Sequence, residues 1–355
     1  MSNEDIDLQL NQFVGQTTQP LVVALRPAIF DVFAVGSISW RTSRFKGLSG
    51  LRSRAAFVRD GTASFNNSRR FAVNSGVKND NPVIFPPGSL RLNLLIEYRW
   101  AEGNYERLRG LADELVQLKV DVLVTHATPA ALAAKSATST IPIVLTAVGD
   151  ILGLGLVSSL RLPGGNITGL SFFTPEFTAK RLELLKEAVP SLTKAALLLN
   201  PDNPLNRRVL QEIEPTAKAS NIALQTFEAR RPSEFGQVFA TMIDQKVAAL
   251  LLYEDTTFNA NSNALAVLAA VNRLPSCGFP EFARAGGLIG YGISLPDMDY
   301  RAAAFVDKIL QGAKPGELPI ERPTKFNIMI NLQTAKALGI TMPPTLLIRA
   351  DEVIE

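Results

Sequence analysis

The sequence predicts an α/β protein with two doubly wound, Rossmann-like lobes joined by a hinge, behind an irregular N-terminal extension. Two observations support this fold class. From residue 92 onward, short apolar runs alternate with helical stretches, mostly of 10–16 residues, a pattern typical of parallel strands covered by helices on both faces. The alternation then restarts after the Gly-rich segment 164–169. A chain of 355 residues is long enough for two lobes, each with its own core.

The first lobe is expected to begin with a strand at 92–98. A helix follows at 105–118, because Leu108, Leu111, Leu115 and Leu118 recur at helical spacing. Continuous apolar runs and helix-forming stretches then predict the other elements of this lobe, in order a strand at 120–125, a helix at 129–136, a strand at 141–146, a helix at 154–160 and a strand at 167–172.

The second series follows the same rules. Its expected elements are a helix at 177–189, a strand at 195–199, a helix at 204–219, a strand at 223–228, a helix at 233–246, a strand at 248–253, a helix at 261–272, a strand at 288–293 and a helix at 297–311. At the C-terminus a strand at 328–330 precedes a short helix that Asn331 caps and Gly339 ends. Pro343 and Pro344 predict no further helix.

The expected lobe boundaries follow from this order. Residues 92–167 with about 294–320 form the first lobe, and residues 168–293 with about 321–355 form the second. Residues 1–91 are expected to be an atypical basic segment, largely irregular, because their composition shows no sustained period. They carry eleven Lys/Arg and six Asp/Glu, a net charge of +5, whereas the rest of the chain carries −2.

Composition argues against several classes of protein. The single cysteine, Cys277, excludes an internal disulfide, and with a single histidine, His126, it argues against a metal site. No Ser or Cys nucleophile pattern accompanies His126, which argues against a role for it as a catalytic base. No apolar run reaches the roughly 18 residues of a membrane span. Met1 is followed by acidic and polar residues, which predicts no secretion signal at this start.

Four loops are the candidate ligand site, because ligands of open α/β sheets bind beyond the carboxyl ends of the strands. N–H groups at the start of a helix suit a carboxylate, and carboxylates and amides suit an ammonium group. Together they suit a zwitterion such as an amino acid, although Asp, Asn and Pro are also ordinary turn and cap residues. The loops contribute Thr128, Pro129 and Ala130; Gly149 and Asp150; Asn200, Asp202 and Asn203; and Tyr253 and Glu254.

The order of motifs also resembles a known family. The segments concerned include Glu97-Tyr-Arg-Trp-Ala-Glu-Gly103, Pro163-Gly-Gly-Asn-Ile-Thr-Gly169, Asn200-Pro-Asp-Asn-Pro204, and the terminal run from Asn331-Leu-Gln-Thr-Ala-Lys-Ala-Leu-Gly339 to Arg349-Ala-Asp-Glu-Val-Ile-Glu355. From about residue 94 to the end, the chain is similar to the substrate-binding proteins of bacterial ABC transporters. Glu281 and Tyr291 lie in matching segments and complete the expected ligand-binding set. Residues 1–91 do not match the family's usual start, which includes its first strand.

The resemblance implies a type I periplasmic-binding fold that closes around a small ligand, an aromatic or branched amino acid or a similar small carboxylate. It implies an ABC permease and ATPase as partners, a periplasmic location, no catalysis and no cofactor. Two alternatives stay open: a ligand-responsive DNA-binding regulator with the same bilobed fold, for which the basic stretch 41–70 is the only sign, and a non-functional truncated family member. An α/β enzyme is a weaker third. No nucleic acid is expected as a partner.

Overall fold

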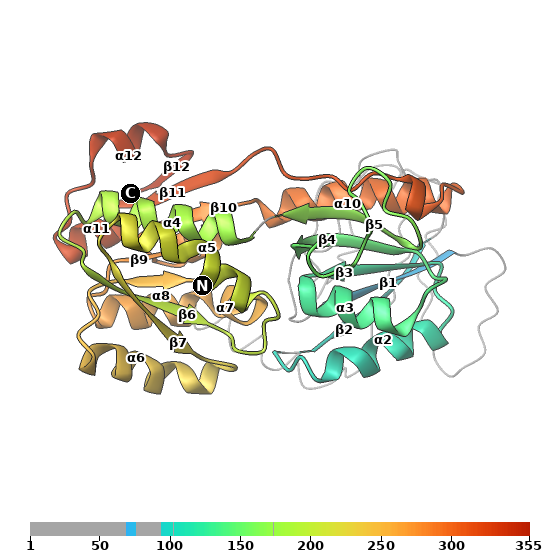
Figure 1. Cartoon of the computed structure of the whole chain (residues 1–355), viewed down its shortest axis with the longest axis horizontal. Helices are drawn as coiled ribbons and strands as arrows, with labels where there is room; N and C mark the ends of the chain where they lie inside the picture. Colours follow the sequence, from blue (N-terminus) through green and yellow to red (C-terminus); the bar gives the residue numbers. More distant parts are fainter. Residues whose placement is uncertain (1–68, 76–93, 102, 173) are drawn as a thin grey trace, which may run out of the picture.

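A five-stranded parallel sheet in the order β2-β1-β3-β4-β5 forms the centre of the first lobe (Figure 1). A computed structural model describes residues 69–75, 94–101, 103–172 and 174–355. The elements of this lobe are β1 (Arg69–Ser75), β2 (Leu94–Trp100), α2 (Arg107–Gln117), β3 (Val122–His126), α3 (Thr128–Ala137), β4 (Ile143–Gly149), β5 (Ile167–Phe172) and, much later in the chain, α10 (Leu295–Leu310).

Both faces of this sheet are buried, which explains the continuous apolar strands. Along β3, Val122 and Val124 belong to one core cluster with the apolar side of α10, whereas Leu123 belongs to another with α2 and α3. Successive side chains of a strand point to opposite faces. One helical layer therefore covers each face, which favours the apolar run from Val122 to Val124.

Strand β1 was not predicted. Residues 69–75 fall in the segment expected to be largely irregular, yet they form an interior strand of the sheet, paired with β2 on one side and β3 on the other. The first strand of the doubly wound sheet is therefore present. The rest of the basic stretch 41–70, on which the regulator alternative depends, lies outside the described residues apart from Arg69 and Arg70.

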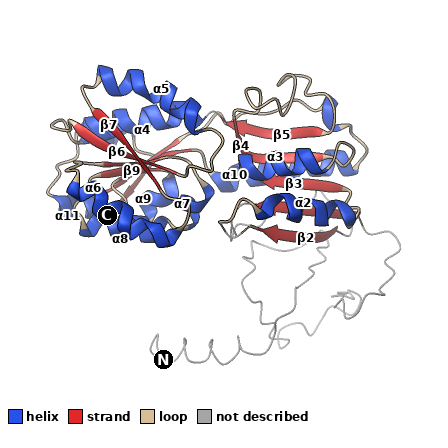
Figure 2. Cartoon of the chain, turned by 60° about the horizontal axis from the view of Figure 1, so that its bottom comes forward, coloured by secondary structure: helices blue, strands red, loops and turns tan. Residues whose placement is uncertain are grey.

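The second lobe contains a seven-stranded sheet in the order β12-β11-β10-β9-β8-β6-β7. Every pair is parallel except β10 with β11. Helices α4 and α5 lie on one face, and α6 and α8 on the other (Figure 2). Its strands are β6 (Lys194–Leu199), β7 (Ala223–Glu228), β8 (Leu250–Leu252), β9 (Ser276–Gly278), β10 (Ile289–Gly292), β11 (Asn327–Asn331) and β12 (Glu352–Ile354). Its helices are α4 (Thr174–Ala188), α5 (Asn206–Ala219), η2 (Pro232–Glu234), α6 (Phe235–Asp244), α7 (Thr256–Ala260), α8 (Ser262–Val271), α9 (Pro280–Arg284), α11 (Leu332–Leu338) and α12 (Pro344–Arg349).

The chain crosses between the lobes three times: after β5, between β10 and α10, and in residues 322–326 before β11. The expected boundary at residue 168 falls inside β5, so the first crossing comes a few residues later than predicted. The short turn η3 (Pro315–Glu317) and Glu321, which bridges to Leu170, stay with the first lobe. Helix α10 packs against strands β3, β4 and β5 of the first lobe.

Aromatic rings join the three crossings. Phe172, at the end of β5, stacks on Phe177 of α4 with ring centroids 5.6 Å apart. Phe177 also contacts Tyr291 of β10, at 6.1 Å, and Phe326 of the third crossing, at 5.4 Å. Phe172 and Phe177 are buried. These four residues, which we call the hinge cluster, pack together the segments about which the lobes would rotate.

Two predictions about helices were wrong. Residues 154–160 form turns rather than a helix, because Gly155 takes a left-handed conformation (φ +62°) and breaks the helical spacing of its apolar neighbours. Pro344 begins a helix instead of preventing one, since proline lacks only an N–H that the first turn does not use. The predicted cap and stop of α11 are both present: Asn331 accepts a hydrogen bond from the Thr334 N–H, and Gly339 has φ +72°.

Candidate functional site

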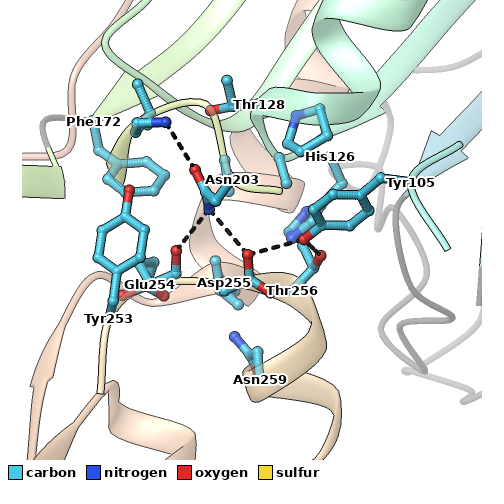
Figure 3. A pocket seen from close by; sticks show the side chains of 15 residues that line it. Tyr105, His126, Thr128, Phe172, Asn203, Tyr253, Glu254, Asp255, Thr256 and Asn259 are labelled. Carbon is cyan, nitrogen blue, oxygen red and sulfur yellow. Dashed lines mark hydrogen bonds between the residues drawn. The ribbon is translucent and has the colours of Figure 1, made fainter. Parts of the chain in front are cut away.

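A small cavity of about 40 Å³ lies between the lobes, at the carboxyl ends of both sheets (Figure 3). Both lobes contribute to its wall. The first lobe supplies Tyr105, His126, Ala127, Thr128, Pro129, Ala147, Phe172 and Leu295, and the second supplies Asn203, Leu205, Tyr253, Glu254, Asp255, Thr256 and Asn259.

The first-lobe wall includes the start of α3. Ala127 turns the chain out of β3 with φ 68° and ψ 161°, and the helix begins at the next residue. The Thr128 hydroxyl accepts a hydrogen bond from the Gly149 N–H at 3.2 Å, which ties the helix start to the end of β4. The unpaired N–H groups and positive dipole end of a helix favour an anion. This wall is therefore suited to a carboxylate.

His126 lies beside this helix start and is oriented from behind. Its Nδ1 is 3.1 Å from the Thr146 hydroxyl and 3.7 Å from Oδ1 of Asp299, a buried residue of α10. These contacts fix the ring against the first lobe. Within the described residues, no group of three or more His, Cys, Asp or Glu side chains is arranged to hold a metal ion.

The second-lobe wall is organised by Asp255, which is buried. Its carboxylate accepts hydrogen bonds from four donors: Asn200 Nδ2 at 3.2 Å, Asn203 Nδ2 at 3.0 Å, the Thr257 N–H at 2.9 Å and the Tyr105 hydroxyl at 3.0 Å. Burial raises the pKa of Asp255, and the four hydrogen bonds oppose that rise. A set made only of donors suits the ionised carboxylate.

Glu254 is held by an arginine that has no exposed surface. The Arg181 guanidinium lies 2.5 Å from the Glu254 carboxylate and donates to the carbonyls of Leu252 and Tyr291. Arg181 therefore joins the ends of β8 and β10 and fixes the loop that carries Glu254 and Asp255. A buried arginine paired in this way stabilises the geometry of the wall more than it adds to net stability.

Among the described residues, two polar contacts join the lobes across the cleft. The Tyr105 hydroxyl reaches Asp255 and Thr256, at 3.0 and 2.7 Å (Figure 3). The Arg208 guanidinium of α5 pairs with Asp150, which follows β4, at 2.5 Å. With these contacts made, the structure is in a closed arrangement.

Five of the twelve candidate residues line the cavity: Thr128, Pro129, Asn203, Tyr253 and Glu254. Three others support it from behind, since Ala130 is buried in α3, Gly149 binds Thr128, and Asn200 binds Asp255. Asp150 forms the inter-lobe ion pair, Asp202 pairs with Arg230 at the surface, and Tyr291 belongs to the hinge cluster. Glu281 lines a separate surface groove beside α7 and α8.

Sequence reasoning missed several residues of the wall. Asp255 and Thr256 lie in a predicted loop but were not selected. Tyr105 precedes α2, Phe172 precedes the first crossing and Leu295 begins α10. Tyr105 lies shortly after the carboxyl end of β2, so the rule that selected the four loops could have selected Tyr105 as well.

Comparison with known proteins identifies the family. The family model described as "ABC transporter substrate binding protein" matches residues 91–354. The chain belongs to this family. Among the described residues of this ABC transporter substrate-binding protein, no helix is long and apolar enough to cross a membrane.

Relatives and solved structures support the assignment. A tyrosine-binding protein of Clostridioides difficile is 28% identical over 249 residues, which cover 70% of this chain and 71% of the relative. A Vibrio cholerae conserved domain protein has a TM-score of 0.73 at 27% identity, covering 81% of this chain and 99% of its own. The ABC domain from Streptococcus pneumoniae in complex with L-Trp has the same TM-score at 25% identity, covering 81% and 100%.

Proposed function

We propose that this substrate-binding protein captures an amino acid with an aromatic or branched side chain, or a similar small carboxylate, by closing its two lobes around it. The observation that supports this ligand class is the pairing of unlike walls. The helix start at Thr128 suits a carboxylate, and Asp255 with its amide partners faces it from the other lobe and suits an ammonium group. Phe172, Tyr253 and Leu295 supply apolar surface between them.

The relatives agree with this class in the terms of their own descriptions: one is called tyrosine-binding, and another was solved with L-Trp. The proposed partners are the permease and ATPase of an ABC importer, and the proposed place of work is the periplasm. The closed state is the one that a permease would recognise, because a ligand that contacts both lobes shifts the population towards it.

Thermal unfolding with a panel of amino acids tests the proposal. A ligand that binds only the folded protein adds RT ln(1 + [L]/Kd) to stability, about 2.7 kcal/mol at a hundredfold excess over Kd. We expect one aromatic or branched amino acid to raise the midpoint. Its methyl ester, which lacks the carboxylate, and its des-amino analogue should each bind about 10- to 100-fold more weakly, the value of a hydrogen bond to a charged group. If the ester and the analogue bind as well as the amino acid, the two walls do not have these roles.

A further inference from the structure

Tyr105 crosses the cleft to bind the wall that we assign to the ligand's ammonium group. Its ring lines the cavity, and its hydroxyl reaches two residues of the opposite lobe (Figure 3). A phenol has one proton, and Asp255 can only accept. The Tyr105 hydroxyl therefore donates to Asp255 Oδ2, and the Thr256 hydroxyl donates to Tyr105.

The four donors around Asp255 differ in one respect. Asn200, Asn203 and the Thr257 N–H all belong to the second lobe, and local structure holds them in place. Tyr105 alone comes from the first lobe, from a turn before α2. It is the one donor of the four that another group can replace without disturbing the fold of the second lobe.

The small size of the cavity is a second observation that concerns Tyr105. About 40 Å³ is room for roughly three water molecules and not for an aromatic amino acid. Much of the wall is fixed: Tyr253 is fully buried, and Asp255 is held by three donors of its own lobe. Tyr105 is partly exposed, and its ring takes up space between the walls. Movement of the Tyr105 side chain would enlarge the cavity and at the same time free the Asp255 carboxylate to accept a hydrogen bond from the ligand.

We propose that Tyr105 competes with the ligand for the cleft: its phenol occupies Asp255 and Thr256, so that a ligand must displace it to bind. This inference rests on the proposed function. An ammonium group makes a charge-assisted hydrogen bond to the carboxylate, about twice as strong as one from a neutral donor, and can replace the phenol. A carboxylate ligand without an ammonium group also has to displace the phenol, but it has no donor that could replace the lost hydrogen bond to Asp255. Tyr105 thereby lowers the affinity of both kinds of ligand by the same factor, and the ammonium bond to Asp255 is what separates an amino acid from a non-amino carboxylate.

The proposal fixes the sign of a mutation's effect. In Tyr105→Phe the ring remains but the competing hydrogen bonds are lost. The amino acid should then bind about tenfold more tightly, which is the value of a hydrogen bond to a charged partner. The des-amino analogue should gain by the same factor, because both ligands are relieved of the same displacement. If Tyr105 instead holds the lobes closed over a bound ligand, its loss weakens binding.

Isothermal titration calorimetry of the full chain with L-tyrosine, L-tryptophan, L-leucine and their des-amino analogues decides between these signs. Tyr300→Phe, an exposed tyrosine on α10, is the matched control and should leave every Kd unchanged. Thr256→Val removes the second partner of the phenol and should shift Kd in the same direction as Tyr105→Phe, which provides a second test if that variant folds poorly.

Each outcome is decisive. Parallel gains for the amino acid and its analogue support the proposal. Equal or weaker binding by Tyr105→Phe, with wild-type protein binding an amino acid, overturns it and leaves the proposed function intact. If neither protein binds any member of the panel, the amino-acid function itself is rejected, and the competition with it.

Discussion

The ion pair between Asp150 and Arg208 should contribute to ligand affinity although neither residue lines the cavity. It joins the lobes at 2.5 Å, so it is made in the closed arrangement and lost when the lobes separate. The Arg208 side chain is 42% exposed and that of Asp150 is 9% exposed. Exposed pairs are worth about 0.2–1 kcal/mol, and the buried partner places this pair near the upper limit. Because binding is coupled to closure, Arg208→Gln should raise Kd about fivefold or less.

Asp150→Asn provides the reciprocal change with little disturbance. Asp150 has φ 42°, a conformation that Asn also tolerates, and its Oδ1 accepts from the Gly153 N–H, which an Asn side chain can keep. Calorimetry with both single variants and the double variant isolates the coupling between the two residues. The control is Lys218→Gln, which removes an ion pair with Glu214 on the same helix but within one lobe.

The salt dependence of Kd tests whether the Asp150–Arg208 ion pair contributes to closure. The screening length falls from about 10 Å at 0.1 M salt to about 3 Å at 1 M. The ratio of variant to wild-type Kd should therefore approach one in 1 M salt. An unchanged Kd in both single variants at low salt, or a loss that salt does not reduce, would show that the pair plays no part in closure.

Three further predictions concern the walls and the hinge. Asp255→Ala should abolish binding and lower the urea midpoint, because each buried donor left without an acceptor, including the Thr257 N–H, is destabilising by about 1–3 kcal/mol; an unchanged midpoint contradicts its role as organiser. Burial raises the pKa of Glu281 above its usual 4.5, so the ionised form destabilises the fold; Glu281→Gln should raise the melting temperature at neutral pH, and the gain should shrink as the pH falls towards 4.5. Phe177→Ala removes a buried ring of the hinge cluster and should destabilise the protein by about 3–5 kcal/mol in urea unfolding; a loss below about 1 kcal/mol would mean that the cluster does not hold the crossings together.

The sequence predicted the α/β alternation because that pattern depends on local periodicity and burial on both faces of each sheet. It did not predict β1, since Phe71, Ala72 and Val73 are the only consecutive apolar residues of this strand. Its place between β2 and β3 is decided by strand pairing, which leaves no local signal. Short helices such as α7 and α9 were missed for a related reason: five residues carry no measurable period.

The candidate site was likewise predicted from the sequence only in part. The rule that ligands bind at strand carboxyl ends identified all four loops, but it could not tell which side chains in each loop face the cleft. Asp150 and Asp202 point to arginines that lie far away in the sequence, and only the fold shows it. Tyr105, Phe172 and Leu295 reach the cavity because the three crossings set one lobe against the other, and this arrangement has no counterpart in the order of motifs.

Phe172 links the two parts of the mechanism, because it belongs to both the cavity wall and the hinge cluster. Phe177 links the Phe172 ring to Tyr291, which precedes the second crossing, and to Phe326 of the third crossing. A ligand that packs on Phe172 therefore contacts the segments that must move when the lobes close. Ligand affinity and closure are then set by one packed group of rings together with two cross-lobe contacts, Tyr105 opposing the ligand and Asp150 with Arg208 assisting it. A ligand can favour the closed state only by its differential binding to it, and in our proposal the phenol of Tyr105, which the ligand must displace, reduces that difference.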